Sequence, residues 1–180
     1  MKLSNIIGTL SGAEEKVIVG DEVFYDTNLI LNGKSIPARI PEYLSGISGK
    51  CKICCNLEST EKEGKLFTYV NILTAERLKN QKTPEANEFL LTAKVQRRDI
   101  VPVPSQGGLS VYMIVSVLTG IRTKKISTIH VTATDKVARQ LANVTLKSMV
   151  ELKGYLKPFR GCLYFRATEV IKVKQENENC

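Results

Sequence analysis

Apolar and polar side chains alternate along most of the chain, in short runs separated by turns that contain Gly, Pro or Asn. This period of two is typical of β-strands that bury one face. Asn32-Gly33 lies between two such runs and is a strong signal for a tight hairpin. In the first half the pattern predicts strands at 6–10, 22–31, 35–40 and 49–57, a brief helical turn at 41–44, a polar loop at 58–63 and a fifth strand that begins at Gly64.

The second half repeats this order and adds a clearer helix. Residues 135–143 have Val137, Leu141 and the following Val144 at helical spacing, with Asp135 expected as the N-cap. The strands around this helix are predicted at 89–95, 109–118, 126–134, 148–156 and 161–173. Superposed directly, KCKICCNLES matches MVELKGYLKP, and GKLFTYV matches GCLYFRA.

Three strands, a helix and two strands make up the element order of the OB-fold, a five-stranded Greek-key barrel. Because the order occurs twice, we predict an all-β protein with two tandem five-stranded OB-fold barrels, each with one short helix between strands 3 and 4. The polar, Pro-containing segment 78–88 is predicted to be the linker. We place the first domain at 1–80, the second at 86–174 and a flexible tail at 175–180.

Charge separates the two halves. The chain has 26 Lys and Arg against 18 Asp and Glu, a net charge of +8. Residues 1–80 hold 10 basic and 10 acidic residues, so the whole excess belongs to residues 81–180. Such asymmetry indicates a polyanionic partner, most simply a nucleic acid, for the basic half. The near-neutral first half is expected mainly to assemble the protein.

Cysteines and sequence motifs give little indication of catalysis. Cys51 and Cys54 form a CxxC, which is half of a zinc motif, but the chain has one His and no second CxxC. Strand alternation offers the alternative that Cys51 and Cys55 are small core residues. No complete P-loop, GxGxxG, HExxH or GxSxG sequence occurs. We therefore expect a protein that is not an enzyme and uses no cofactor and no metal.

Four segments of the second half carry a family resemblance: NEFLLTAKV at 87–95, STIHVTATDKVARQL at 127–141, VELKGYL at 150–156 and LYFRA at 163–167. They resemble the bacterial single-stranded-DNA-binding proteins and their relative, primosomal replication protein N. The first half resembles this group more faintly. The resemblance implies OB-folds that bind single-stranded DNA without strong sequence preference. The family commonly stacks bases on Trp, which this chain lacks, so stacking is expected to fall to Tyr and Phe.

Binding a single strand needs cations along the phosphates and aromatic faces for the bases. OB-folds place both on strands 2 and 3 and on neighbouring loops. Tyr112 and His130 alternate with apolar residues and are expected outside the barrel, although Tyr112 and Tyr155 could instead cover the barrel end and His130 could be structural. Phe159 at a hairpin tip is difficult to explain as core. The expected nucleic-acid-binding residues are Arg97, Arg98, Tyr112, Arg122, Lys124, Lys125, His130, Lys153, Tyr155, Lys157, Phe159 and Arg160.

These features predict a DNA-binding protein of replication or maintenance that forms a homodimer, with other replication proteins as further partners. An RNA-binding OB protein is one alternative, because no residue reads the 2′-hydroxyl unambiguously. A protein-interaction adaptor in a replication complex is the other. No apolar run approaches the length of a membrane span, and the N-terminus becomes polar too early for a signal peptide. We expect a cytoplasmic protein.

Overall fold

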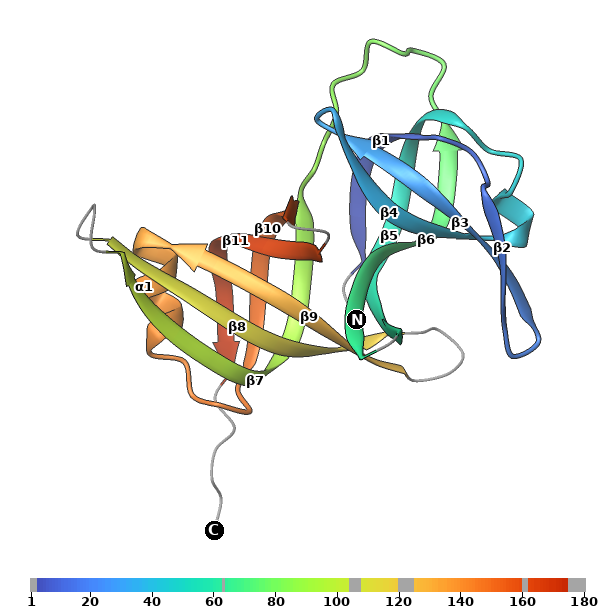
Figure 1. The fold of residues 1–180 in the computed structure, drawn as a ribbon. Helices are drawn as coiled ribbons and strands as arrows, with labels where there is room; N and C mark the ends of the chain where they lie inside the picture. The colour runs from blue at the N-terminus through green and yellow to red at the C-terminus, as the bar shows by residue number, and fades with distance from the viewer. Residues whose placement is uncertain (1–2, 63, 104–107, 120–124, 160–161, 175–180) are drawn as a thin grey trace. The chain divides into compact units, whose positions relative to one another are not determined.

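The computed structural model describes residues 3–62, 64–103, 108–119, 125–159 and 162–174 of the 180-residue chain (Figure 1). The chain divides into two compact units, with the boundary between Phe89 and Leu90. Each unit contains one ring of paired strands with its own buried interior.

Five strands of the first unit form a closed ring. β1 pairs with β5 and β3, β5 with β6, β6 with β4, and β4 with β3. All of these pairs are antiparallel except β4–β6, which is parallel. With the short helix η1 between the third and fourth strands of the ring, this is an OB-fold, as predicted. The elements are β1 Ser4–Leu10, β2 Glu15–Val19, β3 Glu22–Leu31, β4 Lys34–Pro41, η1 Glu42–Leu44, β5 Gly49–Lys62 and β6 Lys65–Arg77.

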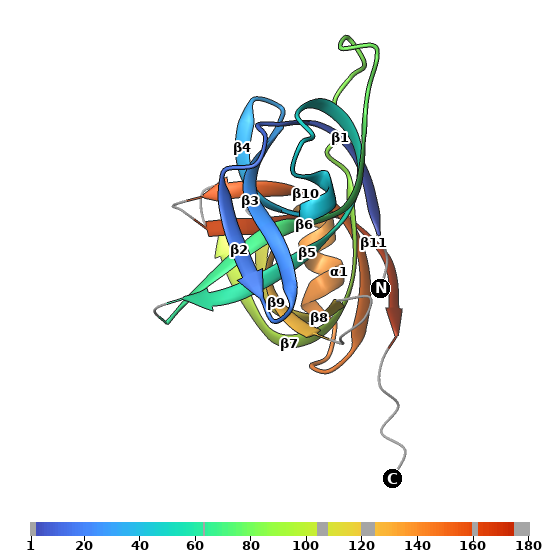
Figure 2. The ribbon, with the colours of Figure 1, turned by 90° about the vertical axis from the view of Figure 1, so that its right-hand side faces the viewer.

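Two features of this unit differ from the sequence prediction. β2 is a sixth strand that pairs with β3 outside the ring, and the two run side by side as a hairpin (Figure 2). It escaped prediction because its side chains are exposed or half-buried, so no buried face imposes alternation. The prediction of a loop at 58–63 was also wrong, because β5 continues to Lys62, where it pairs with Lys65 of β6. Cross-strand pairing of polar residues leaves no hydrophobic pattern to read.

The Cys-containing strand β5 confirms the core interpretation of its cysteines. Cys51, Ile53 and Cys55 have no exposed surface, and desolvation raises the pKa of both buried thiols. Cys54 lies between them and is half-buried. Across the residues that the structure describes, no group of three or more His, Cys, Asp or Glu side chains could hold a metal ion.

The segment predicted as a linker is attached to the first barrel. Ile7 and Ala86 exchange two backbone hydrogen bonds of 3.1 Å each. The backbone N–H of Leu78 donates to the carbonyl oxygen of Lys50 at 2.9 Å. The chain therefore passes along the first barrel before it enters the second.

The second unit is a closed five-stranded barrel with the strand order β10-β11-β9-β8-β7. Its parallel pair is β9–β11, which corresponds to β4–β6 of the first unit. The order strand, strand, strand, helix, strand, strand is confirmed, so this unit is also an OB-fold. The elements are β7 Phe89–Val103, β8 Gly108–Thr119, β9 Lys125–Thr134, α1 Asp135–Ala142, β10 Met149–Phe159 and β11 Cys162–Lys174 (Figure 1).

Helix α1 is held by its apolar face. Ala138 and Leu141 are fully buried, and the helix contacts β8, β9 and β11. The predicted N-cap was wrong by one residue, since Thr134 caps the helix and its side chain makes no capping hydrogen bond. Packing on the barrel therefore takes the place of a side-chain cap. No helix in the described ranges is long and apolar enough to cross a membrane.

Strict alternation decides which side chains leave the second barrel. Over residues 111–119 of β8, 127–134 of β9 and 163–167 of β11, every second residue points into the core, and the residues between them point outward. The buried set is Val111, Met113 and Val115 on β8, Ile129, Val131 and Ala133 on β9, and Leu163, Phe165 and Ala167 on β11.

Candidate nucleic-acid interface

Four aromatic rings form a continuous row on the outer face of the second barrel. The ring centroids of Tyr112 and His130 are 5.6 Å apart, and those of His130 and Tyr164 are 5.7 Å apart. The Phe159 ring lies 6.4 Å from that of Tyr164. Each ring comes from a different strand, β8, β9, β11 and β10 in turn, so the row crosses the strands. The successive rings are tilted by 45–65° rather than stacked on one another.

Pairing across the strands explains why these rings meet. Ile114 of β8 is paired with His130 of β9. Tyr112 lies two residues before Ile114 on the same outward face of β8, next to His130. In the parallel pair, Thr132 of β9 lies opposite Arg166 of β11, which places Tyr164 beside His130. The outward side chains of three neighbouring strands are thereby brought into one line.

Cationic side chains flank the row. Lys157 is exposed on β10 and is paired with Tyr164. Arg166 is half-buried, lies opposite Tyr155 across β10–β11, and donates to the Thr134 hydroxyl at 2.5 Å. A row of ring surfaces with adjacent cations is the combination that unpaired bases and their phosphates require.

The other end of the row carries an ion pair. The Arg97 Nε lies 3.0 Å from a carboxylate oxygen of Asp99, and the Arg97 side chain remains 65% exposed. Asp99 is paired with Tyr112 across β7–β8. Arg97 thus reaches the start of the row, with its charge partly balanced by Asp99.

The structure groups some of the predicted residues and separates others. Tyr112, His130, Lys157 and Phe159 belong to the row or its rim. Tyr155 and Lys153 share the outer face of β10, and Tyr155 is 39% exposed. Arg122, Lys124 and Arg160 lie outside the described residues.

Two predicted residues lie away from the row. Arg98 is paired with Met113, an inward-facing residue. Its guanidinium donates to the carbonyl oxygen of Val144, two residues after the end of helix α1. Lys125 is exposed at the start of β9, five residues or about 16 Å along the strand from His130. Arg98 therefore has a structural position, and Lys125 could reach only a nucleic acid that extends beyond the rings.

Tyr164 and Arg166 were missed in the sequence prediction. The signal was present, because both alternate with the apolar residues Leu163, Phe165 and Ala167 and must face outward. What the alternation cannot show is that β11 lies next to β9. Without that neighbour, Tyr164 looks like an ordinary surface residue of a closing hairpin.

His130 occupies the centre of the row. Its ring contacts the rings of Tyr112 and Tyr164, and desolvation lowers the pKa of its imidazole below the ordinary 6.5. The neutral form of the ring therefore predominates at pH 7. A neutral imidazole adds aromatic surface to the row and leaves Lys157 and Arg166 as the nearby cations.

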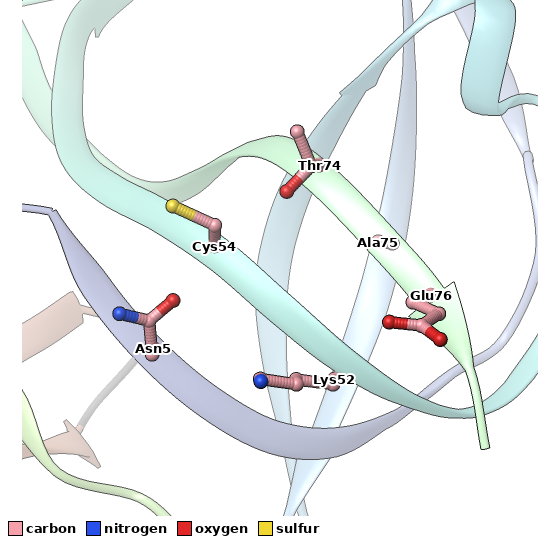
Figure 3. Close-up of a pocket in the computed structure, with 6 residues that line it drawn as sticks. All are labelled: Asn5, Lys52, Cys54, Thr74, Ala75 and Glu76. Carbon is pink, nitrogen blue, oxygen red and sulfur yellow. The ribbon is translucent and has the colours of Figure 1, made fainter.

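The first barrel has a different surface feature, a hollow of about 360 Å³ on the outer face of β1, β5 and β6 (Figure 3). Lys52 and Glu76 face each other across β5–β6, so their charges compensate. The lining contains no aromatic ring and is formed by Asn5, Lys52, Cys54, Thr74, Ala75 and Glu76. It offers a nucleic acid neither a stacking surface nor a net positive charge.

No protein-family model and no curated protein sequence matches this chain. Among solved structures, the single-stranded DNA binding protein from Thermus aquaticus aligns with 100% of this chain and 96% of its own, at 16% identity and a TM-score of 0.74. A deletion mutant of that protein aligns with 98% and 96% of the two chains, at 17% identity and a TM-score of 0.73. The PriB protein from Ralstonia solanacearum aligns with 47% of this chain at 18% identity and a TM-score of 0.43. The likeness to the Thermus protein is one of fold, and it spans both barrels.

Proposed function

We propose that this protein binds single-stranded DNA, largely without sequence preference, and that the second barrel provides most of the binding surface. The row of Tyr112, His130, Tyr164 and Phe159 carries this proposal. Bases in a duplex are stacked on one another, whereas unpaired bases can stack on protein rings. Stacking does not depend on base identity, because every base has a π-face.

Charge supports the same assignment. The net charge of +8 belongs to residues 81–180, and Lys157, Arg166 and Arg97 lie along the ring row. The shared fold with a single-stranded DNA binding protein is consistent with this use of the barrel. We further propose that the protein acts by binding rather than catalysis, in the cytoplasm, as a homodimer in DNA replication or maintenance.

A titration with oligo-dT of increasing length, with mass measurement of the complexes, tests the proposal. We expect saturable binding and a defined number of nucleotides per chain, with single-stranded DNA preferred to a duplex of the same length. Negligible affinity for every oligonucleotide at moderate salt would contradict it and favour the protein-interaction adaptor. Tighter binding of matched RNA oligomers would reassign the ligand to RNA.

Salt should weaken binding steeply. Counterion release gives a slope of log K against log salt of about −0.7 per phosphate contact on a single strand. With four to six cations engaged, we expect a slope of about −3 to −4. The measurement is affinity for one oligo-dT length at several salt concentrations. A slope near zero would remove the electrostatic part of the proposal.

Acidification should strengthen binding through His130. Because desolvation holds the pKa of His130 below 6.5 in the DNA-free protein, the neutral imidazole predominates at pH 7 and the charged form grows as the pH falls. Nearby phosphates favour that charge, so affinity should rise toward pH 5, by at most about tenfold per pH unit for one proton. Folding responds in the opposite sense: the unfolded state takes up the proton more readily, so stability falls as the pH drops below 6.5.

The matched variant is His130→Gln, which removes the titrating group and keeps a polar side chain. Its affinity for oligo-dT should stay nearly constant between pH 7 and pH 5. If the variant kept the pH dependence of the native protein, another group would be responsible.

A further inference from the structure

The strand registers identify equivalent positions in the two barrels. In each parallel pair, an inward residue is followed by an outward one: Ala38 and Arg39 on β4, and Val131 and Thr132 on β9. Arg39 therefore corresponds to Thr132. Across the neighbouring antiparallel strands, Asp26 is paired with Arg39 as Tyr112 is paired with Thr132.

The same reasoning extends to the closing hairpins. Asn71 is opposite Arg39 and corresponds to Arg166, so Tyr69 corresponds to Tyr164. On the fourth strand of each barrel, Glu58 is paired with Tyr69, and Lys157 is paired with Tyr164. The first barrel thus retains one Tyr of the ring row but has a carboxylate at the position of Tyr112 and another at that of Lys157.

These side chains form a continuous chain of contacts in the first barrel. The Arg39 Nε donates to Asp26 at 2.8 Å, and its guanidinium carbon lies 4.7 Å from the centroid of the Tyr69 ring. The Tyr69 hydroxyl donates to Glu58 at 3.1 Å, and the Asn71 side-chain amide donates to the other oxygen of Glu58 at 2.8 Å. Desolvation, followed by the charge of Glu58, raises the pKa of Tyr69, so the phenol stays a donor.

The summed side-chain charge at these five equivalent positions is positive in the second barrel and negative in the first. In the second barrel Lys157 and Arg166 give a charge of +2. The other three positions are neutral and hold Tyr112, Thr132 and Tyr164. In the first barrel Asp26 and Glu58 outweigh Arg39, for a sum of −1. A phosphate approaching Arg39 would have to displace Asp26 and would meet the negative charge of Glu58. A base approaching Tyr69 would find one face of its ring covered by the guanidinium.

We propose that Asp26 and Glu58 are specificity-determining residues that keep single-stranded DNA off the first barrel, by neutralising Arg39 and holding it over Tyr69. This inference rests on the proposed function of the second barrel. Within the Asp26–Arg39 ion pair, the Asp26 side chain is 42% exposed and the Arg39 side chain 16% exposed, so the carboxylate is the part that solvent reaches. Removing the two negative charges should convert this face into a second site for the same ligand.

The test neutralises both carboxylates in the full-length chain, as Asp26→Asn with Glu58→Gln. Both substitutions keep side-chain size and one acceptor oxygen, and each replaces the second acceptor oxygen with an NH2 donor. We expect the number of dT nucleotides bound per chain to rise, and the salt slope to steepen by about 0.7 for each added phosphate contact. In a Tyr112→Ala, Tyr164→Ala background, the same two substitutions should raise oligo-dT affinity at least tenfold.

The control is Glu76→Gln with Asp21→Asn, which makes the same charge change at exposed positions of the first barrel that are not paired with Asp26 or Glu58. An equal gain in the control would overturn the proposal, because it would show a long-range charge effect. If Glu58→Gln lowers the thermal midpoint, Asp26→Asn alone is measured, with a smaller gain expected. No gain from a stably folded variant overturns the inference while native binding stands. Absence of binding by the native chain would instead overturn the proposed function.

Discussion

Replacing both Tyr112 and Tyr164 by Ala should lower the affinity for oligo-dT at least about 30-fold. Each base stacked on an aromatic ring contributes about 1–3 kcal/mol, and these two rings flank His130 on both sides. Losing both leaves His130 without ring neighbours on either side of the row and separates it from Phe159. We therefore expect a larger loss than for Phe159→Ala, which removes one ring at the end of the row.

Two companion variants separate stacking from other causes. Tyr112→Phe with Tyr164→Phe keeps the rings and should retain most of the affinity, because only the hydroxyls are lost. Tyr43→Ala removes a 74% exposed Tyr from the first barrel and should leave binding unchanged. Affinities and thermal midpoints are measured on the same preparations. If the double Ala variant binds like the native chain at an unchanged midpoint, the row is not the DNA site.

Local alternation was sufficient to orient individual side chains. It placed Tyr112 and His130 outside the second barrel and Cys51 and Cys55 inside the first, and the structure confirms these placements. Alternation is a property of one strand, so it could not show which strands are neighbours. The row exists because β11 joins β9 in parallel, a contact between segments far apart in the sequence. That is why Tyr164 was missed.

Comparison of the two halves as sequences failed for a related reason. Superposing the two β5 and β10 segments correctly aligns Glu58 with Lys157, in agreement with the registers. Superposing GKLFTYV on GCLYFRA aligns Phe67 with Tyr164, whereas the registers assign Tyr69 to that position. The β5–β6 hairpin is longer at its turn end than the β10–β11 hairpin. An alignment that starts from the two turns therefore places β6 and β11 in the wrong register. The carboxylate network of the first barrel was therefore hidden in the sequence.

The same close pairing of β10 and β11 makes Gly154 a sensitive position. A Cβ added there would lie 2.1 Å from the carbonyl oxygen of Arg166 and 2.9 Å from both its carbonyl carbon and a ring carbon of Phe165. A register irregularity between Lys153 and Gly154 marks the same point of the hairpin. Backbone atoms of a paired strand cannot move aside as a flexible side chain can, so even one methyl group forces the strands apart.

Gly154→Ala should therefore destabilise the protein by about 3 kcal/mol or more, at the upper end of overpacking costs, and lower its thermal midpoint by about 10 °C. Gly46→Ala is the matched control, because a Cβ there meets nothing within 4 Å, and its midpoint should hardly change. Gly8→Ala should be intermediate, since the closest contacts are the side-chain ends of Leu31 and Leu29 at 2.6 and 2.8 Å. Thermal unfolding of the three variants gives the order. A Gly154→Ala protein as stable as the native chain would show that β10 and β11 do not approach this closely at Gly154.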